Sequence, residues 1–147
     1  MKSFFVVLLC LLCTVLVNAR EFNNEVDKSA FQTLASQSID RFPTVLQTAD
    51  DLVKMPRSDP SRTRMISDFQ NSIYGVLQAI NQMPAFEVGP QEHDPQAQFV
   101  WCLTFSYNFL WKYLESSKKG KNGEITRDDV VEKYECMKTQ YHKLFPN

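Results

Sequence analysis

Apolar residues recur every three to four positions along four stretches of this 147-residue chain, and this spacing predicts helices. The first stretch covers residues 27–55, and its hydrophobic stripe continues through Pro43. Either one helix kinks at Pro43, or a second helix begins there with the proline in its first turn. No stretch alternates apolar and polar residues for long, as a half-buried strand would. The pattern therefore predicts an all-α fold.

Aspartate–proline pairs mark the starts of the next two helices. Asp59-Pro60 precedes a narrow apolar stripe that ends near Met83, and Asp94-Pro95 precedes the apolar residues 99–114. Aspartate is a favoured N-cap and proline a favoured first helical residue. Because residues 99–114 are apolar on nearly every side, we expect this helix to be central and most buried, with no free face.

The fourth helix follows a loop that contains two glycines and three lysines. Thr126 and Asp129 resemble a capping box, and the apolar stripe behind them runs from Val130 to about Phe145. Four helices joined by connections of a few to a dozen residues favour a small antiparallel helical bundle.

The first 19 residues have the features of a secretory signal peptide. Lys2 precedes an apolar run over residues 4–17, which is short for a membrane span. Val17 and Ala19 place small residues at the −3 and −1 positions of a cleavage site. We expect cleavage after Ala19, an extracellular location, and a single helical domain over residues 20–147 without a membrane span. The alternative is a signal anchor that stays attached.

Cleavage would leave two cysteines, Cys102 and Cys136, which predict one disulfide in an oxidising compartment. The two cysteines lie almost equally far from the turn between the third and fourth helices, so an antiparallel hairpin would place them side by side. Cys136 lies at the edge of its helix's apolar stripe, which places the bond at the flank of the interface. An intermolecular bridge is the alternative.

The sequence contains no pattern typical of catalysis or of metal binding. His93 precedes the expected N-cap Asp94, and His142 lies near a helix C-terminus, where a cation is favourable. No nucleotide-binding or hydrolase motif occurs, and no His, Cys or carboxylate residues cluster at ligand spacing. We therefore expect no enzymatic activity, no cofactor and no metal.

The loop before the fourth helix contains two further patterns. Residues 122–126 resemble the second half of an EF-hand loop, but Lys118 and Gly120 stand where carboxylate ligands belong, so we interpret the segment as a glycine turn. Lys118, Lys119 and Lys121 form the one basic cluster, typical of a solvated loop tip. With a net charge of −1, the chain gives no indication of nucleic-acid binding.

Two tryptophans in the third helix give the best candidate binding site. Trp101 projects near a thin polar stripe that contains Asn108 and Lys112, and Trp111 lies at the other margin. Aromatic rings beside polar groups are typical of a ligand cleft, so we predict that these four residues bind ligand. The alternative is that another helix covers the rings.

The second helix also carries a patch of small residues, in which Gly75 points away from the apolar face of the helix and Ser72 and Ala79 lie beside Gly75. Such a patch would allow another backbone to approach closely, and a tolerated surface glycine is the alternative explanation.

These features favour a secreted, non-enzymatic helical bundle that binds a small apolar ligand or lipid in extracellular fluid. The supporting features are the aromatic residues of the third helix, the adaptable methionines and the missing catalytic groups. The alternative is an extracellular signalling or interaction protein that recognises a receptor through a helix face, as helical cytokines do.

Overall fold

The computed structural model describes residues 24–84, 94–119 and 125–146. These residues form four helices and no strand: α2 (Asn24–Lys54), α3 (Arg62–Asn81), α4 (Pro95–Lys119) and α5 (Arg127–Leu144). The predicted all-α fold is confirmed within these ranges. The expected signal peptide, His93 and residues 122–124 of the expected glycine turn lie outside the described residues.

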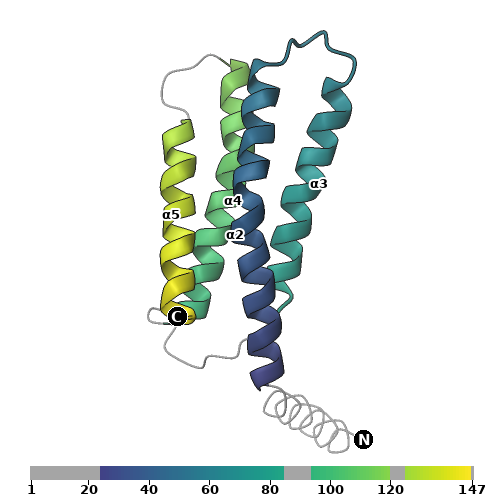
Figure 1. The fold of residues 1–147 in the computed structure, drawn as a ribbon. Helices are drawn as coiled ribbons and strands as arrows, with labels where there is room; N and C mark the ends of the chain where they lie inside the picture. Colours follow the sequence, from purple (N-terminus) through teal and green to yellow (C-terminus); the bar gives the residue numbers. More distant parts are fainter. Residues whose placement is uncertain (1–23, 85–93, 120–124, 147) are drawn as a thin grey trace, which may run out of the picture.

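The four helices run in alternating directions and form a bundle (Figure 1). α2 and α4 each pack against all three other helices, whereas α3 and α5 lie on opposite flanks of this pair. The closest association is the antiparallel hairpin of α4 and α5. Each connection reverses the chain, as short connections between neighbouring helices require.

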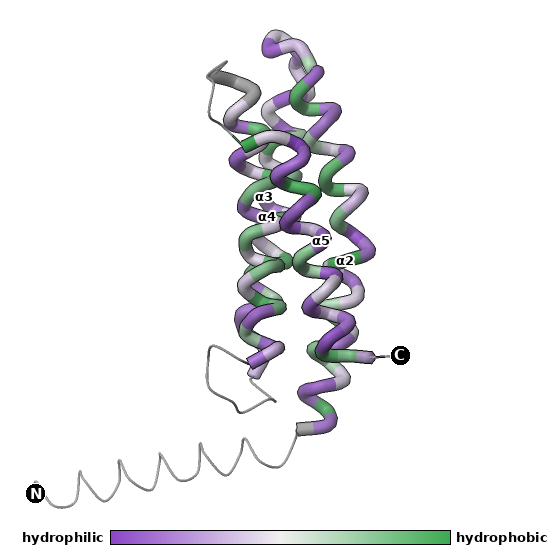
Figure 2. Tube along the Cα trace, turned by 90° about the vertical axis from the view of Figure 1, so that its left-hand side faces the viewer, coloured by the Kyte–Doolittle hydropathy of each residue, from purple (hydrophilic) through white to green (hydrophobic). Residues whose placement is uncertain are grey.

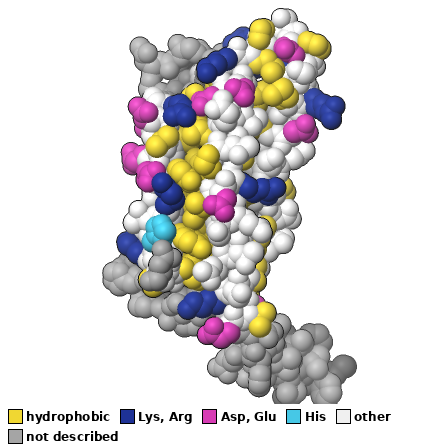
Figure 3. Space-filling view, in the orientation of Figure 1, with side chains coloured by type: hydrophobic (Ala, Val, Ile, Leu, Met, Phe, Trp, Pro, Cys, Tyr) yellow, Lys and Arg dark blue, Asp and Glu magenta, His cyan; other side chains and the backbone are white. Residues whose placement is uncertain are grey.

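Hydrophobic and hydrophilic residues recur in turn along each helix, as they do when one face of an amphipathic helix is apolar and the other polar (Figure 2). The core contains buried side chains from all four helices: Phe31, Phe42, Leu52, Phe69, Ile80, Phe99, Leu103, Leu110, Leu114, Val130 and Met137. On the face seen in Figure 3, a band of hydrophobic side chains follows the seam between α5 and α2, with charged groups on both sides.

Pro43 lies inside α2, which continues through it as one helix. A proline has no N–H to donate to the carbonyl four residues earlier, which is that of Ile39. The hydroxyl of Tyr134 on α5 donates to this carbonyl at 3.3 Å, and Tyr107 of α4 donates to the adjacent Ser38 carbonyl at 2.6 Å. The Tyr134 hydroxyl therefore replaces the donor that is missing at Pro43, and of the two alternatives the single helix is correct.

The predicted caps of α4 and α5 are confirmed. A carboxylate oxygen of Asp94 accepts from the N–H of Gln96 at 2.9 Å. Thr126 and Asp129 form a complete capping box, in which each side chain accepts from the other residue's backbone N–H. The first-turn N–H groups of both helices thus receive side-chain acceptors.

α3 begins two residues later than Asp59-Pro60 predicts. The carboxylate of Asp59 accepts from the N–H of Ser61 at 2.8 Å, but this segment forms a tight turn and the α-helix starts at Arg62. The buried guanidinium of Arg62 then donates to the carbonyls of Leu52 and Met55 at the end of α2. One arginine thereby satisfies terminal carbonyls of the preceding helix.

α4 contacts three other helices, as a central helix should, but it also has an exposed face. The side chain of Trp101 is 56% exposed, and Asn108 and Lys112 are exposed. The prediction that this helix has no free face is therefore wrong. The physical reason is that α3 and α5 pack on opposite flanks and leave the outer side of α4 uncovered.

The hairpin of α4 and α5 brings Cys102 and Cys136 within bonding distance, with their Cα atoms 5.8 Å apart. This separation lies in the range that a disulfide spans. Cys102 is buried and Cys136 half-buried, so the pair lies at the flank of the interface, as predicted. The geometry supports pairing within one chain.

Candidate functional site

A groove opens between the C-terminal end of α3 and the N-terminal end of α4. Its volume is about 430 Å³, which is within the range of small-molecule sites. Trp101 forms one wall, and the side chains that line the groove are mostly apolar. The full lining is Ile80, Asn81, Met83, Asp94, Gln96, Ala97, Val100, Trp101 and Thr104.

Polar groups gather at the end of this groove where α4 begins. The Asp94 carboxylate is engaged as the helix cap, and the buried Gln96 donates from Nε2 to the Pro84 carbonyl at 3.1 Å. These bonds fix the two side chains in place. An apolar wall with a few fixed polar groups at one end is the usual composition of a site for small ligands.

The structure brings only one of the four predicted ligand-binding residues to this groove. Trp101 lines it, but Trp111 lies ten residues further along α4, about 15 Å away along the helix axis. Trp111 packs against Phe69 of α3, with ring centroids 6.4 Å apart. Asn108 and Lys112 are exposed, and they line neither this groove nor the one between α2 and α3.

The outer face of α4 instead carries a row of aromatic rings. The rings of Trp101 and Phe105 lie 4.4 Å apart, and those of Phe105 and Phe109 lie 6.1 Å apart. The ammonium groups of Lys112 and Lys133 lie 5.7 and 5.8 Å from the centre of the Phe109 ring. The row is therefore an aromatic surface whose far end is positively charged.

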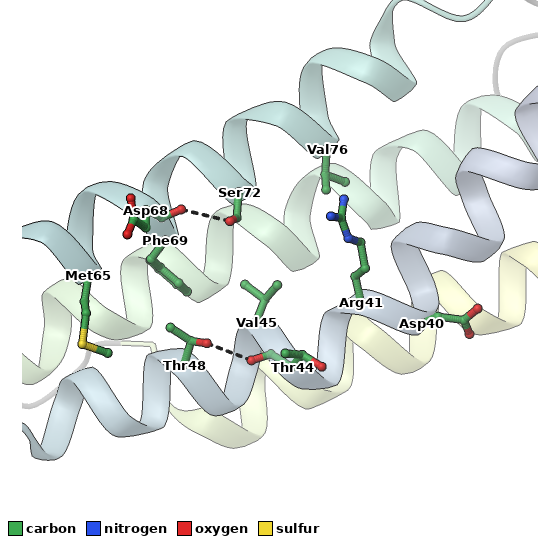
Figure 4. A pocket seen from close by; sticks show the side chains of 10 residues that line it. All are labelled: Asp40, Arg41, Thr44, Val45, Thr48, Met65, Asp68, Phe69, Ser72 and Val76. Atoms are coloured by element: carbon green, nitrogen blue, oxygen red, sulfur yellow. Dashed lines mark hydrogen bonds between the residues drawn. The ribbon is translucent and has the colours of Figure 1, made fainter.

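A second groove lies between α2 and α3 (Figure 4). Its volume is about 480 Å³, and Val45, Phe69 and Val76 supply apolar side chains to its floor. The rim consists of small or polar side chains, including Thr44, Thr48 and Ser72. The complete lining is Asp40, Arg41, Thr44, Val45, Thr48, Met65, Asp68, Phe69, Ser72 and Val76.

Sequence reasoning missed the second groove, although part of its signal is visible in the sequence. The predicted patch of small residues on α3 faces α2: Ser72 lines the groove, and Gly75 and Ala79 line a small recess that continues it. A Cβ atom at Gly75 would meet no atom within 4 Å. The small side chains thus border open space instead of a closely approaching backbone.

A third polar cluster joins three helices at the opposite end of the bundle from the first groove. The buried carboxylate of Asp50 accepts from the hydroxyl of Tyr113 at 2.9 Å and from Nε of Arg127 at 3.0 Å. The hydrogen bond to Asp50 raises the pKa of Arg127, and burial raises that of Tyr113. Because both oxygens of the carboxylate are engaged, the cluster serves to join α2, α4 and α5.

Neither a metal site nor a bilayer-spanning helix is seen in the described part of the chain. No three His, Cys, Asp or Glu side chains there gather closely enough to hold a metal ion. No helix within those ranges combines the length and apolar character needed to cross a bilayer. His142 lies in the last turn of α5, as predicted, with its ring edge-on to Tyr141.

Comparisons of the chain with protein-family models, with curated proteins and with solved structures found no match. The function is therefore inferred from the geometry of the two grooves and from the chemistry of the residues that line them.

Proposed function

We propose that this protein is a secreted, non-enzymatic helical bundle that binds a small apolar ligand or lipid in the groove between α3 and α4. The observation that carries the proposal is the placement of Trp101. This large aromatic side chain is 56% exposed and forms a wall of a 430 Å³ groove beside Ile80, Met83 and Val100. Covering the exposed part of the indole with an apolar ligand would remove apolar surface from water, which favours binding.

The nature of the lining supports a binding function over a catalytic one. The side chains at the polar end, Asp94 and Gln96, are already used in the helix cap and in a bond to a backbone carbonyl. They can orient a polar end of a ligand but form no nucleophile–base pair. Met83 adds a flexible apolar side chain, which adapts to ligands of different shape.

The extracellular location is part of the proposal. Residues 1–19 would direct secretion and would then be removed, so the mature protein would begin at Arg20. N-terminal sequencing of protein from the medium of producing cells tests this step. Retention of residues 1–19 on a membrane-bound product would contradict it.

Ligand binding is tested by tryptophan fluorescence with the neutral apolar probe N-phenyl-1-naphthylamine. The variant Trp111→Phe leaves Trp101 as the sole tryptophan. We expect the probe to quench this emission in a saturable way, because it would lie beside the indole.

Two further variants locate the probe. Ala97→Phe fills the groove and should abolish binding. Tyr74→Ala is the matched control, because Tyr74 is 66% exposed and lines neither groove, so it should bind the probe normally. Undiminished affinity in Ala97→Phe, or absence of saturable quenching, would contradict the proposal.

The aromatic row on α4 favours a second candidate function, recognition of a protein receptor through a helix face. Phe105 separates the two functions, because it belongs to this row and lines neither groove. A Phe105→Ala variant that binds the probe normally but no longer binds a receptor-bearing cell surface would favour the interaction function. Equal cell binding by wild type and variant would count against it.

A further inference from the structure

The groove between α2 and α3 is open because its rim carries small side chains. Thr44 and Thr48 of α2 face Ser72 of α3, and none of the three reaches the opposite helix. Beyond them, a recess of about 60 Å³ beside Gly75 shares Arg41 and Val76 with the main groove. The opening therefore continues along the contact line of the two helices.

Two of the three hydroxyl groups on the rim already donate to backbone carbonyls. The hydroxyl of Thr48 donates to the Thr44 carbonyl at 3.0 Å, and that of Ser72 donates to the Asp68 carbonyl at 2.9 Å. A hydroxyl has one proton, so these two groups have no donor left for a ligand. The remaining donors are the hydroxyl of Thr44 and the guanidinium of Arg41, which lie one helical turn apart on α2.

Arg41 is the unpaired charge that faces the groove. Within the described residues it makes no ion pair, and Figure 4 shows its side chain extending from α2 toward Val76 of α3. Two carboxylates also border the groove. Asp40 points away from it, and Asp68 lies 3.8 Å from Arg64 on the same helix.

The floor on one side of Arg41 is apolar over a defined length. Val45 lies one helical turn from Arg41, Phe69 lies beyond Val45, and Met65 closes the far end. From Arg41 to Thr48 the distance along α2 is about 10 Å, and from Val76 to Met65 along α3 it is about 16 Å. The floor therefore fits an extended alkyl chain of medium length with a polar group at the Arg41 end.

We propose that this groove binds a single-chain amphiphile with an anionic carboxylate. The carboxylate contacts the guanidinium of Arg41 and the hydroxyl of Thr44, and the alkyl chain lies over Val45 and Phe69 toward Met65. The site is separate from the groove beside Trp101 and does not depend on the function proposed for that groove. Charge complementarity selects the headgroup, since a carboxylate is the partner that a guanidinium fork matches best.

Isothermal titration calorimetry with three twelve-carbon probes tests the proposal, each kept below its micelle concentration. The probes are dodecanoate, dodecanol and dodecyltrimethylammonium. We expect dodecanoate to bind at least about 10-fold more tightly than either of the others, because a charge-assisted hydrogen bond contributes on that scale. Equal affinity for the carboxylate and the ammonium compound would overturn the assignment of the headgroup.

Matched charge-removing variants identify the cation. Arg41→Ala should weaken dodecanoate binding about 10-fold and leave dodecanol binding unchanged. Lys143→Ala removes an exposed cation of α5 that lines neither groove, and it should change neither affinity. Equal losses in the two variants would show that only general surface charge matters and would overturn the role of Arg41.

A filling variant tests the location of the chain without touching the charge. Ser72 is exposed, so Ser72→Phe should fold, as checked by circular dichroism, while its ring occupies the groove. We expect it to abolish dodecanoate binding and to leave N-phenyl-1-naphthylamine binding beside Trp101 intact. Wild-type affinity for dodecanoate in Ser72→Phe would place the ligand elsewhere and refute the proposal.

Discussion

At the scale of single residues, the centre of the bundle is organised around the proline in α2. Phe42, which precedes Pro43, stacks on the ring of Tyr134 with centroids 4.6 Å apart and meets the ring of Tyr107 edge-on at 5.3 Å. The hydroxyls of the same two tyrosines donate to carbonyls one turn before the proline. Both rings thus bury apolar surface, and the hydroxyl of Tyr134 also gives the Ile39 carbonyl the donor that Pro43 lacks.

The first prediction concerns the hydrogen bond of Tyr107. Tyr107→Phe keeps the ring but removes a buried hydrogen bond to the Ser38 carbonyl, so the free energy of unfolding should fall by about 0.5–1.5 kcal/mol. Tyr134→Phe is the matched control and should cost less, because Tyr134 is half-buried and its bond is longer. Urea titration measures both, and equal losses would contradict this ranking.

The second prediction concerns alkaline pH. Burial raises the pKa of Tyr107 above its ordinary value of 10.0. The native state therefore keeps this proton where the unfolded chain loses it, and stability should fall as the pH rises above about 10. Burial also raises the pKa of Tyr113 and of Tyr134, so several groups contribute to the decline.

Tyr107→Phe removes one of these groups, so its stability should decline with pH less steeply than that of the wild type. The difference in slope should approach about 1.4 kcal/mol per pH unit above pH 10. Urea titrations between pH 9 and 11.5 measure it. Parallel declines of wild type and variant would show that Tyr107 loses its proton as easily in the folded state as in the unfolded state.

At the scale of helices, the sequence predicts local features better than contacts. The periodicity predicts the number of helices, and the signals at Asp94 and Thr126 predict two starts, because a cap involves only neighbouring residues. The start of α3 is displaced because residues 59–62 form a tight turn, in which Asp59 accepts from the N–H groups of Ser61 and Arg62. Arg62 then bonds to the end of α2, a contact that the Asp-Pro signal does not encode. The exposed face of α4 depends likewise on where α3 and α5 pack.

The third prediction concerns Gly75 in the middle of α3. An added methyl group would meet no neighbour, and alanine favours the helix, so Gly75→Ala should raise the free energy of unfolding by roughly 0.5–1 kcal/mol. Thermal unfolding followed by circular dichroism measures the change. A lower stability would mean that α3 approaches α2 closely at this point, which would also close the recess beside it.

The fourth prediction concerns the hairpin of α4 and α5. If Cys102 and Cys136 are joined within one chain, the unreduced protein should be a monomer lighter by two hydrogens than its reduced form. The double variant Cys102→Ser with Cys136→Ser should lose about 3–4 kcal/mol, the loop-closure value for a separation of 34 residues. A dimer that dithiothreitol separates would show instead that the bridge is intermolecular.

At the scale of the whole molecule, α3 borders both grooves. One lies between α3 and α4 beside Trp101, and the other lies between α2 and α3 beside Arg41. A groove depends on how two helices diverge, so the spacing of apolar residues within each helix cannot specify it. This is why the sequence indicates Trp101 as a binding residue but groups it with Asn108 and Lys112, which share its side of α4 and not its groove.

Both grooves support the same central proposal, that this protein binds apolar or amphiphilic molecules. The most direct measurement, and the fifth prediction, is native mass spectrometry of the protein purified unreduced from its natural source. We expect an added mass that denaturation removes and that identifies the class of ligand. A bare protein that also fails to take up N-phenyl-1-naphthylamine or dodecanoate would contradict the claim and favour recognition of a protein partner.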